Sequence, residues 1–245
     1  MTELSIYAFI EGVTEERLLK QIGVSRSVTI INCHGKDKIP DKVEAILKAV
    51  LGTQPTGILI LRDRDHNETH SSIVQSFEDV INELLLELKI SNQSFKPHQK
   101  FKNLYEIDVP GANSRVALHI AAPPSISGME FVSDTIDGYI LALAMNESVL
   151  EKFAEKADIA PEALRAKVIE EVPKLAKDNG INFDQAKDFL GAYMVMSRFF
   201  TNNRSEKDDV FSGVVVNRAK KRVTDEFQEI FRSIKTALDF LEIDL

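Results

Sequence analysis

The feature that most constrains this chain is an unbroken aliphatic run that ends in two aspartates. Residues 57–61 read GILIL, and Asp63 and Asp65 follow within the string RDRD. An aliphatic run of this length is typical of a central strand that is covered on both faces. Open α/β sheets bind ligands at the carboxyl ends of their strands, so the two carboxylates fall where a ligand is expected.

The spacing of these two aspartates predicts a cation site. Carboxylates at positions i and i+2 gather negative charge in a small volume, which is unfavourable unless a cation balances it. Carboxylate oxygens are the hard donors that Mg²⁺ and Mn²⁺ prefer, so Asp63 and Asp65 are candidate metal ligands. The alternative is an ordinary polar turn, because aspartate is common after strands.

A second acidic cluster follows the first expected strand, residues 4–10. Residues 11–16 read EGVTEE and lead into a helical pattern. Thr14 is a candidate N-cap for that helix, and Glu15 suits its first turn because the helix dipole favours anions there. Neither effect explains Glu11, which falls at a strand end as Asp63 does. Glu11 is therefore a further candidate site residue.

The order of these motifs resembles a known family. A strand, then EGVTEE and a helix, then a later strand that ends in DRD, is similar to the Toprim domain of topoisomerases, bacterial primases and OLD-family nucleases (overcoming lysogenisation defect). EGVTEERLL is closer to OLD-like and small stand-alone Toprim proteins than to topoisomerases. After the expected strand 28–32, Gly35-Lys36 matches a Gly-Lys pair that OLD-like domains often carry. The resemblance covers roughly residues 3–125.

The resemblance implies roles for individual residues. It implies that Glu11, Asp63 and Asp65 bind Mg²⁺ or Mn²⁺, with Glu15 as a further ligand or supporting group. It also implies that Glu11 transfers a proton. Lys36 would stabilise phosphate charge in the transition state, and its alternative is an ordinary loop lysine.

OLD-like proteins complete the site with acidic residues after the sheet. Asp137 in TIDGYIL is the best candidate for this ligand, ahead of residues 127–130 (SGME), and Lys187 is a candidate for a later lysine. Small stand-alone Toprim proteins often have two adjacent acids where this chain has Asp-Gly. The alternative for Asp137 is an acid that stabilises a helix terminus.

The pattern of elements predicts an α/β fold. Strands, with helices at 41–51 and 73–89, alternate up to residues 116–120, which indicates a mainly parallel sheet of four to five strands flanked by helices. The expected domains are a Toprim-like catalytic domain at 1–125 and an all-helical region at 126–245 packed on it. The helices expected in the second region are 137–145, 149–156, 162–177 with a break at Pro173, 184–200 and 217–241.

Composition limits the classes of protein that fit. The net charge is −8, whereas a dedicated DNA-binding domain is usually basic. Basic side chains cluster in residues 96–102 and 218–222, which could meet phosphates or form solvated faces. A single cysteine, the lack of a visible secretory signal and the lack of a long apolar run favour a cytoplasmic protein without a membrane segment.

These observations predict an Mg²⁺- or Mn²⁺-dependent nuclease that hydrolyses phosphodiester bonds in nucleic acid. The family resemblance favours DNA over RNA and suggests a role in phage defence or DNA repair. The sequence has no Walker-type phosphate loop, so the chain is not expected to be an ATPase itself. It would act as a stand-alone enzyme or with a partner ATPase, and a homodimer is also compatible with the sequence. Two alternatives remain, namely a non-catalytic Toprim scaffold that binds or senses with a partner ATPase, and a phosphatase with an aspartate nucleophile.

Overall fold

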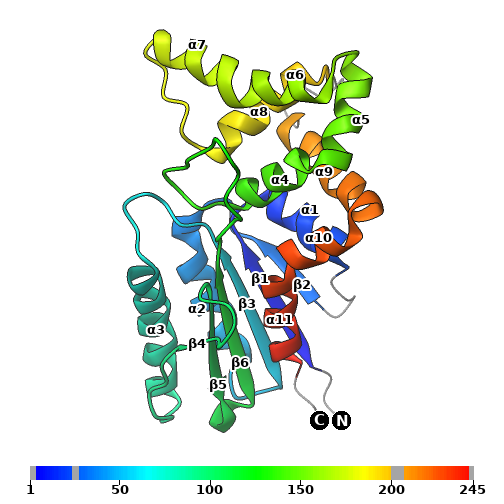
Figure 1. Cartoon of the computed structure of the whole chain (residues 1–245). Coiled ribbons are helices and arrows are strands. Elements are labelled where there is room, and N and C mark those ends of the chain that lie inside the picture. The colour runs from blue at the N-terminus through cyan, green and yellow to red at the C-terminus, as the bar shows by residue number, and fades with distance from the viewer. Residues whose placement is uncertain (1–3, 24–27, 200–206, 243–245) are drawn as a thin grey trace. The chain divides into compact units, whose positions relative to one another are not determined.

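The chain folds into two compact units. The computed structural model describes residues 4–23, 28–199 and 207–242 (Figure 1). One unit comprises the described residues of Met1–Ala121 and Phe231–Leu245, and the other comprises Ala122–Ile230. The division differs from the expected one at 125/126 because the chain returns to the first unit at Phe231.

The first unit is built on a six-stranded sheet, which confirms the α/β class. Its strand order is β2-β1-β3-β6-β5-β4, and β2, β1, β3 and β6 are parallel. The sheet has one strand more than the expected four to five. The strands are β1 (Ser5–Ile10), β2 (Val28–Asn32), β3 (Thr56–Arg62), β4 (Lys96–Pro97), β5 (Leu104–Val109) and β6 (Ser114–Ile120).

The register of the sheet aligns the ends of its strands. Ile10 at the end of β1 pairs with Asn32 of β2, and Arg62 at the end of β3 pairs with Ile120 of β6. The loops after these four parallel strands therefore leave from one edge. β5 and β4 run antiparallel at the other side of β6, and the short β4 contains Pro97, which is tolerated at a sheet edge.

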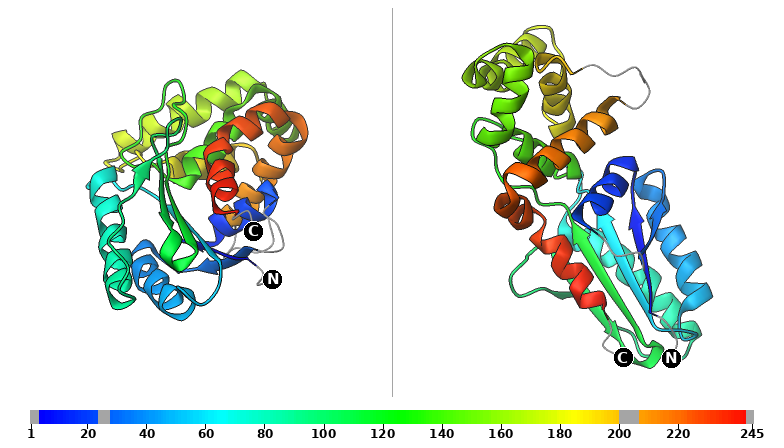
Figure 2. Two further views of the ribbon diagram at one scale, coloured as in Figure 1. Left: turned by 90° about the horizontal axis from the view of Figure 1, so that it is seen from below. Right: turned by 90° about the vertical axis from the view of Figure 1, so that its right-hand side faces the viewer.

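Helices cover both faces of the sheet. In Figure 2, α2 and α3 lie on one side of the strands and α11 lies on the other. Buried aliphatic and aromatic side chains of α2, α3 and the strands form the main core on the first side. The helical segments of this unit are α1 (Val13–Ile22), η1 (Lys36–Lys38), α2 (Ile39–Val50), α3 (His70–Glu87), η2 (Pro110–Ala112) and α11 (Arg232–Leu241).

The C-terminal helix α11 packs on the sheet. A Cβ atom on Gly57 of β3 would lie 3.2 Å from the Cβ atom of Leu241, so glycine allows this close approach. The Arg115 guanidinium also donates to the carbonyl oxygens of Phe240 and Glu242 at 3.1 and 3.0 Å. The expected single helix over 217–241 is wrong, because three helices occupy this segment.

A buried histidine joins α11 to the sheet. His119 Nε2 lies 3.0 Å from Asn103 Nδ2 and 2.9 Å from Ser233 Oγ of α11. The Asn103 amide nitrogen can only donate, so His119 Nε2 is an acceptor. Burial lowers the pKa of His119 to about 3, because the interior disfavours the imidazolium ion.

This histidine makes stability depend on pH. Between pH 6.5 and about 3 the unfolded chain binds one proton more at this position than the folded chain, so stability falls as the pH falls through that window. We expect a contribution of about 1.4 kcal/mol per pH unit to the free energy of unfolding. Urea unfolding at a series of pH values should show this slope, and His119→Gln should lack it. An identical slope in both proteins would contradict the assignment.

Helices joined by loops make up the described part of the second unit. Phe153 of α5 packs edge-on against Tyr193 and Phe211 at centroid distances of 5.4 Å each, and the Arg218 guanidinium lies 4.2 Å from the Phe153 centroid. The helices are α4 (Ile136–Met145), α5 (Glu147–Ala157), α6 (Pro161–Ala166), α7 (Val172–Asp178), α8 (Ala186–Met196), α9 (Lys207–Arg222) and α10 (Thr224–Ile230).

The expected break at Pro173 takes an unusual form. A π-helical segment, η3 (Lys167–Glu171), joins α6 to α7, and Pro173 lies in the first turn of α7. Proline lacks the N–H that a continuous α-helix needs at this position. The expected helix over 162–177 is therefore present, with a π-helical segment in its middle. The polar loop expected at 201–209 lies mostly outside the described residues, and α9 begins at Lys207.

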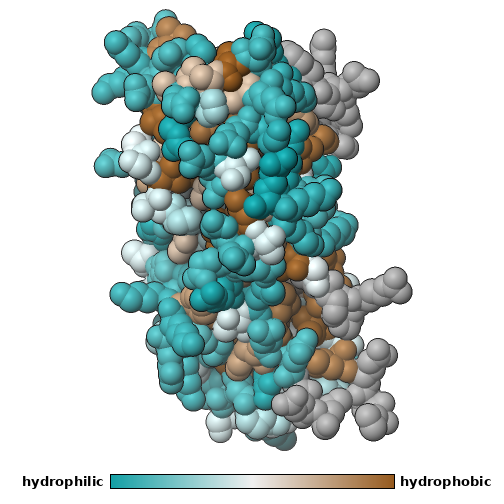
Figure 3. Space-filling view, turned by 45° about the vertical axis from the view of Figure 1, so that its right-hand side comes forward, coloured by the Kyte–Doolittle hydropathy of each residue, from teal (hydrophilic) through white to brown (hydrophobic). Residues whose placement is uncertain are grey.

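Hydrophilic side chains cover most of the face in Figure 3, with apolar residues scattered among them. Among the described residues, every helix is too short or too polar to cross a bilayer.

Candidate functional site

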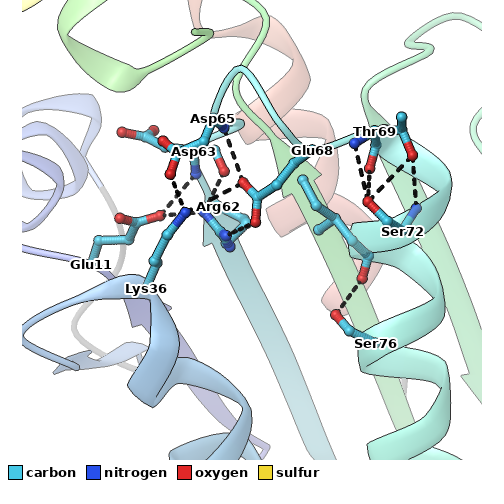
Figure 4. Close-up of polar contacts among 10 residues, drawn as sticks. Glu11, Lys36, Arg62, Asp63, Asp65, Glu68, Thr69, Ser72 and Ser76 are labelled. Carbon is cyan, nitrogen blue, oxygen red and sulfur yellow. Dashed lines mark hydrogen bonds and ion pairs between the residues drawn. The ribbon is translucent and has the colours of Figure 1, made fainter.

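The structure brings Glu11 and Asp63 together at the carboxyl edge of the sheet. Glu11 directly follows β1 and Asp63 directly follows β3, which lie side by side. The Asp63 backbone N–H donates to Glu11 Oε1 at 3.0 Å, although 52 positions separate the two residues. Asp65 lies in the same cluster (Figure 4). The structure therefore brings Glu11 to the backbone of Asp63, with Asp65 in the same turn, whereas the Glu11 and Asp65 carboxylates contact Arg62 and Lys36, respectively.

The loop after β2 supplies a cation to this cluster. The N–H groups of Cys33 and Gly35 donate to the carbonyl oxygens of Ile10 and Glu11, each at 2.9 Å. Gly35 has φ +121°, a conformation that side chains rarely allow, so glycine is required for this path. Lys36 follows, and its ammonium group forms an ion pair with the Asp65 carboxylate.

Arg62 is a second cation in the cluster, and the sequence analysis did not assign it a role. Its side chain is only 8% exposed. Nη1 donates to Glu11 Oε1 at 3.0 Å and also to the Asp63 carbonyl oxygen, and Nη2 donates to Glu68 Oε1 at 2.6 Å. Its position at the end of an otherwise aliphatic, buried strand signals the role, because a buried guanidinium needs carboxylate partners.

Glu68 completes the cluster and was also missed. The Asp65 N–H donates to Glu68 Oε2 at 2.9 Å, and the Glu68 N–H donates back to the Asp65 carbonyl oxygen at 3.0 Å. Lys36 Nζ lies 3.6 Å from Glu68 Oε2. The turn after β3 thus directs Glu68 toward both Arg62 and Lys36, as Figure 4 shows.

The electrostatics of the cluster differ between its members. Burial raises the pKa of Glu11, and Arg62 and the Asp63 N–H offset this only in part. The hydrogen bond from Lys36 lowers the pKa of Asp65, and the same bond raises the pKa of Lys36. The cluster therefore holds a carboxyl whose pKa is raised beside one whose pKa is lowered. Such separation is common at acid–base sites.

Glu15 has a structural role that differs from its expected one. Its Oε2 accepts a hydrogen bond from the Gly12 N–H at 3.1 Å, and Gly12 is the N-cap of α1 instead of the expected Thr14. Glu15 is buried and occupies the third position of the helix. Its carboxylate thus stabilises the turn that follows Glu11.

Asp137 belongs to the helical unit, whereas the cluster belongs to the sheet unit. Asp137 is in the first turn of α4, and residues 127–130 and Lys187 lie in the same helical unit. Asp137 has the position of an acid that stabilises a helix terminus, which is the alternative that the sequence left open.

The carboxylate oxygens of the cluster are suitable ligands for a divalent cation, but their present arrangement does not form a metal site. Four carboxylates and two cationic side chains leave two net negative charges if all six are ionised. Within residues 4–23, 28–199 and 207–242, no group of three Asp, Glu, His or Cys side chains is arranged to hold a metal ion. Lys36 and Arg62 lie against the carboxylates instead, so metal binding requires Lys36 to leave Asp65.

A pocket of about 310 Å³ adjoins the cluster on the α2 and α3 side. Lys36 and Arg62 line it together with Glu68, and Ser72 and Ser76 of α3 contribute hydroxyl groups. The Ser72 and Ser76 hydroxyls donate to the carbonyl oxygens of Thr69 and Ile73 at 2.9 and 2.8 Å. These hydrogens are therefore already engaged, and Lys36 and Arg62 supply the positive charge that would suit an anionic group.

Comparisons with known proteins support the fold and leave the function open. No protein-family model matches the chain, and no curated protein matches it. The crystal structure of a hypothetical protein from Pyrococcus horikoshii OT3 is similar, with a TM-score of 0.53 and 15% sequence identity over 98% of each chain. At this identity the similarity concerns the fold alone.

Proposed function

We propose that this protein is a nuclease that hydrolyses phosphodiester bonds with the help of Mg²⁺ or Mn²⁺. The observation that carries the proposal is the convergence of Glu11, Asp63 and Asp65 at one sheet edge, next to Lys36. Rigid strands position these groups, and the cluster has an excess of negative charge. The resemblance to OLD-like Toprim domains supports the same assignment.

The carboxylates of the cluster have different proposed roles in the reaction. Asp63 and Asp65 are the proposed metal ligands, with Glu11 as a third ligand. A divalent cation in such a site stabilises the charge on the attacking and leaving oxygens of a phosphodiester. Glu11 also suits proton transfer, because its raised pKa lies closer to the working pH than that of an ordinary carboxyl. Glu15 and Asp137 remain proposed supporting ligands on the family resemblance alone.

Lys36 has two proposed states. In the structure it neutralises Asp65. If Asp65 were to hold a metal ion, Lys36, which lines the 310 Å³ pocket, would be placed to contact a phosphate and to stabilise negative charge there. Lys36 is therefore proposed to neutralise Asp65 when no metal is bound and to contact the substrate phosphate when a metal is bound.

The substrate and partners follow from the resemblance. We propose DNA over RNA as the substrate, and a cytoplasmic role in phage defence or DNA repair. A partner ATPase would supply the domain that OLD-family proteins usually carry. A test of purified protein against plasmid, single-stranded DNA and total RNA with each metal separates the substrates.

Lys36→Met tests the proposed function through two readouts. Removing the competing ammonium group should tighten Mn²⁺ binding by calorimetry, because two unit charges near a protein surface interact by about 4 kcal/mol at 4 Å. Cleavage should nevertheless fall by about 100-fold, because the phosphate loses its cation. Lys174→Met, at an exposed position of α7, is the matched control. Unchanged binding and unchanged cleavage would overturn the role of Lys36.

A second candidate function is a non-catalytic scaffold. The ion pairs of Lys36 with Asp65 and of Arg62 with Glu11 favour it, because they satisfy the carboxylates without a metal. Such a scaffold would bind or sense together with a partner ATPase. It predicts that Mg²⁺ and Mn²⁺ leave the melting temperature unchanged, whereas the nuclease predicts an increase.

A further inference from the structure

A larger pocket of about 700 Å³ lies in the sheet unit, away from the acidic cluster. The loop after β4, strand β5 and helix α11 form its walls. Its basic lining residues are Lys96, Lys100 and Arg232, and Glu106 is the acidic residue that faces them. The pocket is therefore positively charged in a chain whose net charge is −8.

The ammonium groups of the two lysines in this pocket are not neutralised by a carboxylate among the described residues. Lys96 and Lys100 are both exposed, and among the residues that the structure describes neither forms an ion pair. Lysines elsewhere in the chain, such as Lys48 and Lys167, pair with a glutamate. Unpaired ammonium groups beside a hollow are suited to phosphate oxygens, which are anionic acceptors.

The pocket also contains a preformed aromatic platform. The rings of His98 and Phe101 are stacked, with centroids 5.3 Å apart and an interplanar angle of 24°. The N–H groups of Lys100 and Phe101 donate to His98 Nδ1 at 3.1 and 3.3 Å, so the proton of the neutral ring is on Nε2. The His98 N–H donates to the Leu104 carbonyl oxygen at 2.8 Å. These bonds fix the loop before any ligand arrives.

The loop lies at the same sheet edge as the acidic cluster. The Ile120 N–H donates to the Asn103 carbonyl oxygen at 2.9 Å, and Ile120 pairs with Arg62 at the end of β3. β4 is three strand positions from β3, which corresponds to about 14 Å at the usual spacing of strands. The pocket contacts α11 on one face of the sheet, whereas the 310 Å³ pocket lies on the α2 and α3 face, so a ligand that reached both would pass over this edge of the sheet.

The geometry points to a binding subsite for single-stranded nucleic acid, with Lys96 and Lys100 on consecutive phosphates and a base stacked on the Phe101 platform. The combination of cations with an aromatic face is the chemistry that binds single strands independently of sequence. This inference rests on the proposed function, since it names the form of the substrate that the acidic cluster would cut.

Binding without metal tests the subsite apart from the chemistry. A short fluorescein-labelled oligothymidylate is titrated with the whole protein in EDTA, and anisotropy gives Kd at several salt concentrations. Lys96→Glu with Lys100→Glu should weaken binding at least tenfold. It should also reduce the slope of log K against log salt by about 1.4, or about 0.7 for each phosphate contact. Phe101→Ala should weaken binding about fivefold or more.

The control is Lys174→Glu with Lys177→Glu, at two exposed positions of α7. This pair carries the same charge change and should leave Kd unchanged. The inference is overturned if the pocket variants bind as the unchanged protein does, or if the control loses as much affinity. It is also overturned if Phe101→Ala has no effect and inorganic phosphate competes as well as unlabelled oligothymidylate, because the site would then bind phosphate alone.

The two proposals fail separately. Asp63→Asn with Asp65→Asn should abolish cleavage and leave metal-free oligonucleotide binding intact. Loss of oligonucleotide binding in the pocket variants without a change in Mn²⁺ affinity supports the subsite whether or not the acidic cluster is catalytic. Pocket variants that bind the oligonucleotide normally, together with loss of cleavage in the aspartate variant, would overturn the subsite and leave the nuclease assignment standing.

Discussion

Arg62→Met is expected to lower the free energy of unfolding by about 3 kcal/mol. The Arg62 guanidinium is nearly buried and bridges Glu11 and Glu68. Its loss leaves two partly buried carboxylates without their main cation, and methionine fills the space without replacing the charge. We place the effect at the lower end of the usual range, because water still reaches both carboxylates. Urea unfolding monitored by circular dichroism measures it.

Two further variants check the cause of this loss. Arg222→Met changes an exposed arginine at the end of α9 and should change stability by less than about 0.5 kcal/mol. Arg62→Met combined with Glu68→Gln should recover at least about 1 kcal/mol relative to Arg62→Met alone, since the unpaired charge is reduced. A double variant as unstable as the sum of the single changes would show that packing, not charge, sets the effect.

Asp63→Asn combined with Asp65→Asn is expected to reduce metal-dependent cleavage by about 100-fold or more. Loss of a residue that merely supports a metal ligand already costs about 10–100-fold in other sites, and here two ligands are removed. The backbone N–H of Asp63 still donates to Glu11, so the turn keeps its path. Cleavage of plasmid and of single-stranded DNA with Mn²⁺ measures the change.

Asp108→Asn is the matched control for this pair, because Asp108 is an exposed aspartate on β5 away from the cluster. It should cleave at the normal rate. The increase in melting temperature on adding Mn²⁺ should vanish in the double aspartate variant and persist in the control. If the double variant cleaves normally, the acidic cluster is not the catalytic site.

The sequence predicts which residues lie at the carboxyl edge of the sheet. Aliphatic runs such as residues 57–61 identify central strands, and parallel strands end at one edge whatever their separation in the chain. Glu11 and Asp63 therefore had to approach each other once both were recognised as strand ends. Gly35-Lys36 was also visible in the sequence, in the short loop that follows the strand ending at Asn32.

The ion pairs of the cluster could not be predicted in the same way. Glu68 reaches Arg62 through the particular turn after β3, and no periodic pattern encodes the direction of a turn side chain. The breaks that divide residues 207–241 into three helices are equally hidden, since apolar residues continue through Val223, Phe227 and Ile234 at helical spacing. Packing of α11 on the sheet decides where the chain turns.

A crystal structure of the protein grown with Mn²⁺ tests the account most directly. We expect an anomalous density peak among the carboxylates of Glu11, Asp63 and Asp65, with the Lys36 ammonium group displaced from Asp65. Absence of that peak at saturating Mn²⁺, with the Lys36–Asp65 ion pair intact, would contradict the metal-dependent nuclease and favour the scaffold.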